Sequence, residues 1–373
     1  MSINRDFADL ARSSQPGKNM LINGAMRVSQ RGTSFTSYGA TDSEYGLDRW
    51  KIRSISSASA RWTASQESSG GVSGKDKWLK VLNTTADASP GADETQWITQ
   101  PIEGFNSTSV VADDGTTKSM SVSLDIIAHA DGAGSISFPA KVAVFLDMGA
   151  GASREYVHDV TIAAADTWER VSFTAPSDSF GTWAADNAAN LGIGISLYGG
   201  SGRVAAEDTW RAMGRDNITS NTDNWADATN NYLGFTNVQL EVGGPTDFSH
   251  EDYGTAIHKA RRYYHRIDAS TGTTAAPIAF VRTVSNMKLG WFIEPKMRTS
   301  PSVETSGNAD DYNVNYSGGN VVCSAVPSLV SASGGDVLGI RLQVASGPSA
   351  GEACMLEFLS GTATGYLAFD AEL

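Results

Sequence analysis

The chain has 373 residues, of which 40% are hydrophobic and 18% charged, and its formal net charge at pH 7 is −13. A surface with this excess of acidic groups repels phosphate backbones, so we expect no nucleic-acid partner. No stretch approaches the roughly 18 consecutive apolar residues that a membrane-spanning helix needs, so we expect no membrane insertion. The 38 glycines are typical of a β protein with many turns.

Residues 1–18 form a polar lead in which Ile3, Phe7 and Leu10 recur at helical spacing. The lead has charged residues and no apolar core segment, so we expect synthesis without export. A helix this short is not stable alone and needs a partner surface. We therefore predict an anchoring helix with Ile3, Phe7 and Leu10 as its assembly contacts, and the alternative is a frayed terminus.

Residues 19–248 are dominated by strands in which apolar and polar residues alternate. The runs Met120–Ile126 and Leu191–Leu197 show this period of two, which indicates antiparallel sheets with one buried face. No helical stretch separates the runs, which excludes βαβ units. We predict an all-β fold that begins with a jelly-roll β-sandwich.

Three features mark the end of this predicted sandwich and the start of a second domain. The apolar phase shifts between Phe235 and Val238, which predicts a β-bulge. Residues 249–267 are expected to connect the domains through a short helix, roughly Thr255 to Tyr264. Residues 268–373 are predicted to form a smaller C-terminal β-sandwich, since strand alternation resumes there.

The two cysteines, Cys323 and Cys354, are too few for a disulfide framework. Cys354 shares one face of a predicted strand with Leu356 and Phe358, so we predict buried free thiols. A Cys323–Cys354 bridge is the alternative.

Catalytic and metal sites are not indicated. The segment Gly347–Gly351 matches a nucleophile elbow, but the last histidine, His265, precedes it, and a hydrolase of that type needs one after it. No histidine has a partner at zinc-ligand spacing. A glycosidase needs two carboxylates, and the 41 acidic residues leave every pair open. We predict a protein that is not an enzyme, with no catalytic residues and no metal ligands.

The nine tryptophans are the strongest indication of a ligand. Sugars stack their apolar faces on aromatic rings while polar side chains reach their hydroxyls. Trp50 and Trp168 follow strand patterns and are expected in the core. A long polar loop, Glu207–Asn231, is unusual inside a sandwich and is expected to be functional. The candidate ligand residues are Trp183, Trp210, Trp225, Asp223 and Asn224. In the alternative, Trp210 and Trp225 pin the loop to the sandwich or to a neighbouring subunit.

Three further segments stand out by their order along the chain. They are Asn19–Gly32 with Leu47–Trp50, then Val238–Gly243 with Phe248 and Arg261–Tyr264, and finally Gly365–Leu373. Together these landmark segments resemble a family of bacteriophage virion and tail-fibre structural proteins that carry a carbohydrate-binding-like jelly-roll module.

The resemblance implies a structural protein of the virion, assembled in the host cytoplasm, in a tail fibre or similar appendage. It implies a homotrimer that contacts other virion proteins and adheres to host-surface glycans through many weak contacts. It implies no cofactor, although it allows a structural calcium. The alternatives are a capsid-decorating or connector protein without a host ligand, and a surface-polysaccharide hydrolase.

Overall fold

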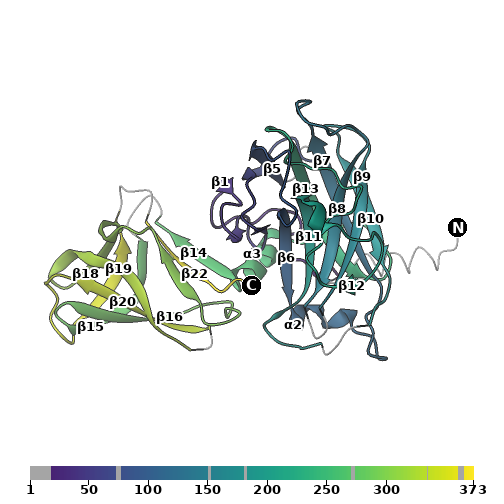
Figure 1. The fold of residues 1–373 in the computed structure, drawn as a ribbon. Helices are drawn as coiled ribbons and strands as arrows, with labels where there is room; N and C mark the ends of the chain where they lie inside the picture. The colour runs from purple at the N-terminus through teal and green to yellow at the C-terminus, as the bar shows by residue number, and fades with distance from the viewer. Residues whose placement is uncertain are drawn as a thin grey trace. The chain divides into compact units, whose positions relative to one another are not determined.

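The computed structural model describes residues 18–72, 77–149, 153–179, 183–269, 274–333, 335–359 and 365–373 (Figure 1). The predicted assembly contacts Ile3, Phe7 and Leu10 lie outside these residues. The chain divides into two compact units, the first ending at Ala256 and including Leu373, the second running from Ile257 to Glu372. In both units the named strands pair antiparallel, which confirms the all-β prediction.

The first unit is a sandwich of two sheets, as predicted. In sheet order, the six-stranded sheet contains β1 (Ser34–Tyr38), β4 (Arg61–Glu67), β5 (Trp78–Thr85), β13 (Tyr232–Val242), β7 (Met120–His129) and β10 (Glu169–Ala175). The seven-stranded sheet contains β12 (Arg211–Ala212), β9 (Arg154–Ile162), β8 (Ala140–Met148), β11 (Ala189–Gly199), β6 (Thr95–Glu103), β3 (Lys51–Ile55) and β2 (Ser43–Tyr45). A short helix, α2 (Gly104–Ser107), follows β6.

One hydrophobic core fills the sandwich because alternate residues of both sheets point inward. Leu124 and Ile126 from β7 and Ile193 and Ile195 from β11 are fully buried in it. Trp50 is also fully buried, as predicted from its strand pattern. Burial of large apolar side chains is the main stabilising contribution to such a fold.

The predicted β-bulge lies in β13, where its register with β7 shifts between Thr236 and Gln239. Asn237 takes a left-handed conformation there, with φ of 49°. The Arg170 guanidinium donates to the Asn237 carbonyl at 2.8 Å, and the Asn237 amide donates to Asp125 at 2.7 Å. The first bond satisfies the Asn237 carbonyl, which the interrupted ladder leaves without a strand partner, and the second fixes the Asn237 side chain.

The first landmark segment is hydrogen-bonded to the C-terminal half of β13. The Asn19 side chain donates to the Val238 carbonyl at 2.9 Å and accepts from the Leu240 amide at 3.1 Å. The Met20 amide donates to the Leu240 carbonyl, and the Val238 amide donates to the Gly24 carbonyl, both at 2.9 Å. Two landmarks that are about 220 residues apart in sequence are therefore direct neighbours in space.

Asn23 joins the same segment to Trp50. Its side-chain amide donates to the carbonyls of Val28 at 2.9 Å and Asp48 at 3.0 Å, and its side-chain oxygen accepts from the Val28 amide at 2.8 Å. The Trp50 indole donates to the Asn23 carbonyl at 3.2 Å. Asn23 has a positive φ of 59°, a conformation that asparagine tolerates better than most residues.

The second unit consists of a closed barrel and a three-stranded sheet. In barrel order the strands are β15 (Thr274–Thr283), β16 (Asn286–Phe292), β20 (Val337–Val344), β19 (Gly319–Ser333), β18 (Tyr312–Tyr316) and β21 (Ala353–Phe358). The sheet contains β14 (Tyr264–Asp268), β22 (Tyr366–Asp370) and β17 (Ser302–Thr305). We predicted a smaller β-sandwich for this unit. The all-β class is confirmed, but the main sheet closes into a barrel. Strand alternation did not reveal this, because it indicates a buried face and not whether a sheet closes on itself.

The predicted connecting helix is α3 (Tyr253–Arg261), which spans the division between the units. Next to it, β14 pairs with β22 so that Tyr264 lies opposite Asp370, and the Ala371 amide donates to the Tyr263 carbonyl at 2.8 Å. The last two landmark segments are thus also in contact. No helix within the described residues is both long enough and apolar enough to cross a membrane.

Cys323 and Cys354 are buried free thiols, as predicted. Burial raises the pKa of the Cys323 thiol to about 12 and that of Cys354 to about 11. Thiols with such pKa values remain protonated at neutral pH and are poor nucleophiles.

The contact between Gly24 and β13 predicts a specific sensitivity to substitution. A Cβ atom on Gly24 would lie 2.2 Å from the Val238 carbonyl oxygen, a backbone atom that cannot rotate away. We expect Gly24→Ala to lower the free energy of unfolding by about 1–3 kcal/mol, the usual cost of overpacking. Gly244→Ala is the control, because its Cβ would meet no atom within 4 Å. Equal denaturation midpoints for the two variants would contradict the assigned contact.

Candidate functional site

The long polar loop after β11 is attached to the sandwich by the residues predicted to bind ligand. Trp225 is fully buried, and its indole donates to the Lys141 carbonyl at 3.1 Å. The Asp223 carboxylate accepts from the Lys141 amide at 2.6 Å, and burial raises the pKa of Asp223. The Asn224 side chain donates to the Asp87 carbonyl at 2.9 Å and accepts from the Ala226 amide at 2.9 Å.

The ligand role predicted for Trp225 is therefore wrong, and the alternative that it pins the loop is what the structure shows. Composition alone does not distinguish an anchoring tryptophan from a ligand-binding one, because both occur in polar loops. Asp223 and Asn224 have structural partners as well. Trp183 is half-buried and packs against the sandwich core.

Trp210 is half-buried at one edge of the sandwich, and its indole donates to the Pro176 carbonyl at 2.8 Å. Its ring centroid is 5.2 Å from that of Tyr156 on β9. His158, two residues further along β9, stacks on Phe173 of β10 with ring centroids 4.5 Å apart. We call these side chains, together with Glu207 and Asp208, the edge cluster.

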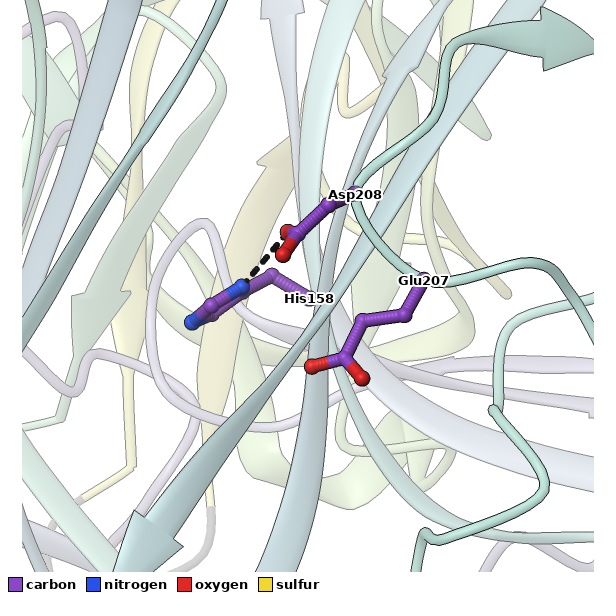
Figure 2. Close-up of side chains that lie close together, drawn as sticks. All are labelled: His158, Glu207 and Asp208. Carbon is purple, nitrogen blue, oxygen red and sulfur yellow. Dashed lines mark hydrogen bonds and ion pairs between the residues drawn. The ribbon is translucent and has the colours of Figure 1, made fainter.

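Figure 2 shows the polar part of the edge cluster, His158, Glu207 and Asp208. The His158 Nδ1 atom is 2.7 Å from Asp208 Oδ1, which also accepts from the Tyr156 hydroxyl at 2.9 Å. The Glu207 carboxylate accepts from the Asp159 amide at 3.3 Å. One potential ligand atom from each of the three side chains lies within 4.8 Å of the others, so together they could hold a metal ion.

An imidazole with two carboxylates suits zinc or a related transition metal, whereas calcium prefers oxygen ligands throughout. The cluster thus does not match the structural calcium that the resemblance allows. Sequence reasoning missed it because Asp208 is 50 residues from His158, and no spacing motif covers that distance.

A second group of aromatic side chains lies on the outer face of the six-stranded sheet. Trp78 of β5 and Trp168 before β10 meet edge to face with centroids 5.4 Å apart, and the Tyr232 centroid on β13 is 6.4 Å from that of Trp78. His129 of β7, the direct cross-strand partner of Tyr232, stacks on it at 5.4 Å. We call these four side chains the aromatic surface.

Trp168 was predicted in the core, and this prediction is wrong. The residue precedes β10, so strand alternation does not apply to it, and its ring is half-buried outside the sandwich. Its indole donates to the Gly70 carbonyl at 2.7 Å, which fixes the ring orientation.

Gly234 makes room for the aromatic surface. It lies on β13 between Trp78 and Ile127, and a Cβ atom there would come within 2.5 Å of the Trp78 ring and 2.7 Å of Ile127. The absence of a side chain lets the Trp78 ring lie against the backbone of β13. A glycine inside a strand often marks such a close approach.

Charged groups border the aromatic surface. The Lys80 ammonium is 4.3 Å from the Tyr232 ring centroid. The Tyr232 hydroxyl donates to Asp166 at 2.9 Å, and the other Asp166 oxygen is 2.9 Å from His129 Nδ1. Aromatic rings beside fixed hydrogen-bonding groups are the chemistry that sugar binding requires.

The hydrolase alternative calls for two adjacent carboxylates, and Asp147 on β8 lies directly opposite Glu155 on β9. The Glu155 carboxylate is held by the loop: it accepts from the Gly214 and Arg215 amides at 2.8 and 3.1 Å and pairs with Arg211 at 2.8 Å. Burial, with a further contribution from the Glu155 charge, raises the pKa of Asp147 to about 6. Glu155 thus has a structural role in attaching the loop.

No protein-family model matches the chain, and no curated protein matches it by sequence. Among solved structures, the enzymatically active domain of tailspike protein 4 from bacteriophage CBA120 is similar at 8% identity and a TM-score of 0.30, over 61% of this chain and 22% of that one. An arabinose-bound α-L-arabinofuranosidase is similar at 14% identity and a TM-score of 0.31, over 61% and 27%.

The family 11 carbohydrate-binding module from Clostridium thermocellum, in complex with a mixed-linked tetrasaccharide, is similar at 12% identity and a TM-score of 0.28, over 57% of this chain and 98% of the module. The similarity covers only about a quarter of the length of the first two proteins. TM-scores this low do not establish a common fold, so the architecture rests on the strand pairing itself.

The raised pKa of Asp147 predicts a pH-dependent stability. Above pH 6 the folded protein carries a buried carboxylate that the unfolded chain ionises more easily, so Asp147 lowers stability there. Asp147→Asn should raise the free energy of unfolding at pH 7.5 by about 1–3 kcal/mol, and the gain should fade as the pH drops through 6 toward 4.

Denaturant titrations at several pH values measure this difference, with Asp131→Asn, an exposed carboxylate in the same unit, as the control. If Asp147→Asn raises the free energy of unfolding equally at every pH, the gain does not come from a carboxyl group with a raised pKa. That result would contradict the prediction.

Proposed function

We propose that the chain is a non-enzymatic adhesion module of a bacteriophage surface appendage, a tail fibre or similar, and that it binds glycans of the host surface. The observation that carries the glycan-binding part is the aromatic surface. Tyr232 lies there on β13 and Trp168 directly before β10, both half-buried, next to the carboxylate of Asp166 and the ammonium of Lys80. Rigid elements position binding groups more accurately than loops do.

The appendage part of the proposal is supported by the landmark segments. Their resemblance to phage virion proteins is matched by a structural role, since Asn19 joins the first landmark to β13 and Tyr264 lies opposite Asp370. We propose that the chain acts in the virion as a homotrimer in contact with other virion proteins, with Ile3, Phe7 and Leu10 in the assembly contacts. Several copies would multiply a modest affinity per site.

We favour a binding role over hydrolysis because, in the adjacent pair Asp147 and Glu155, the Glu155 carboxylate is already held by loop amides and by Arg211. We also favour a module with a ligand over a purely connecting protein, because a connector has no need for half-buried aromatic rings beside fixed charges.

The proposal predicts that binding depends on Trp168. A host-surface oligosaccharide first identified on a glycan array should lose about tenfold or more in affinity for Trp168→Ala, since stacking on an aromatic ring contributes on the order of 1–2 kcal/mol. Isothermal titration calorimetry measures the change.

Trp210→Ala is a matched control, because Trp210 is also half-buried and also donates its indole proton to a backbone carbonyl. Binding that is lost with Trp210→Ala and kept with Trp168→Ala would place the site at the edge cluster instead. Affinity unchanged in both variants would contradict a glycan site built on these rings.

A further inference from the structure

Three cationic side chains on the barrel of the second unit line one cavity. Arg282 of β15, Lys288 of β16 and Arg341 of β20 border a volume of about 330 Å³, together with Asn286, Met287 and Val330. This volume is within the roughly 300–1,000 Å³ range of small-ligand sites. The cavity thus combines positive charge with apolar lining.

Strand pairing places these charges next to one another. Lys288 and Arg341 are direct cross-strand partners, and both are exposed because they alternate with buried neighbours. Like charges directly opposite each other in a sheet are destabilising. An anion bound between them would remove this repulsion.

No side-chain hydrogen bond or ion pair joins Arg282, Lys288 or Arg341 to any residue in the part of the chain that the structure describes. Other cations of the same unit have carboxylate partners: Arg266 is 2.6 Å from Asp268, and Lys296 is 3.7 Å from Asp336. The chain has 41 acidic residues against 28 basic ones, so carboxylates are plentiful. Among the described residues no carboxylate lines this cavity, so its positive charge is available to a ligand.

Apolar groups lie beside the charges on the same outer face of the barrel. Phe280, the cross-strand partner of Lys288, is 62% exposed, and Phe292 on β16 is 79% exposed. Between Lys288 and Phe292, Gly290 lies opposite Gly339, and a Cβ on Gly290 would meet no atom within 4 Å. The surface is therefore open at Gly290, whereas the Ser331 hydroxyl lies over Gly339, 2.3 Å from a Cβ placed there.

We propose that this cavity binds an acidic oligosaccharide through its carboxylate or phosphate groups, with the sugar ring over Gly290. Arginine suits such groups because its guanidinium donates two parallel hydrogen bonds to them. The exposed phenylalanines provide the apolar surface that a sugar face packs against. The inference builds on the proposed glycan adhesion but places this contact in the second unit, on different residues from the aromatic surface.

The test uses the full chain with trigalacturonic acid and its neutral methyl ester as paired probes, measured by calorimetry. The acid should bind, and the methyl ester should bind about tenfold more weakly or not at all, since it lacks the charge-assisted hydrogen bonds. Affinity for the acid should also fall as salt is added. Equal binding of the two probes, or binding of neither, would overturn the proposal.

Lys288→Gln and Arg341→Gln should each weaken binding of the acid about tenfold, while the control Lys296→Gln should leave it unchanged. The two cavity variants should melt at or above the parent temperature without ligand, because each removes a like-charge contact. This result would separate lost binding from lost folding. A cavity variant that is folded and binds normally would overturn the proposal, as would a preference for single-stranded DNA over the acid.

Trp168→Ala distinguishes this inference from the proposed function, because Trp168 belongs to the other unit. It should leave binding of trigalacturonic acid unchanged. If the cavity variants fail to bind the acid while Trp168→Ala binds it normally, the acid binds at the cavity. This conclusion holds whether or not the aromatic surface binds a glycan. If Trp168→Ala abolishes acid binding, the acid binds at the aromatic surface and the cavity proposal falls.

Discussion

The first unit depends on the hydrogen bonds that fix its N-terminal segment to β13. Asn19 and Gly24 bind the backbone at Val238, within the bulge, and Asn19 also binds Leu240 just after it. β13 in turn pairs with both β5 and β7 and is a central strand of the six-stranded sheet. Its N-terminal half carries Tyr232 and pairs there with both β5 and β7, so the same central strand positions the aromatic surface.

The two proposed ligand sites, the aromatic surface and the barrel cavity, offer different chemical groups to a ligand. The aromatic surface offers rings with one carboxylate and one ammonium, whereas the barrel cavity offers three cations, with exposed phenylalanines beside it. On a chain with net charge −13, such a cationic cavity stands out as the place for an anionic group. A polysaccharide with neutral and acidic units would satisfy both, and weak contacts at two places would add up in one particle.

The sequence predicted those features that depend on residues close together in the chain. The phase shift at Phe235 and the strand face of Cys354 have a local cause, and both predictions are confirmed. The alternation in Met120–Ile126 correctly predicted antiparallel pairing, but its polar face is buried as well, because other segments of the chain cover it. Two other features depend on residues that are far apart in the sequence. They are the closure of the barrel and the contact between His158 and Asp208, and no local pattern predicts them. Trp168 and Trp225 were misassigned because a tryptophan's burial depends on which segments cover it.

The most direct test of glycan binding on the aromatic surface is the NMR spectrum of the nine tryptophan indole N–H groups during titration with the host oligosaccharide. We expect the signals of Trp168 and Trp78 to shift, while those of the buried Trp50 and Trp225 stay in place. Shifts confined to Trp210 or Trp183, or no shift in any indole on saturation, would contradict it.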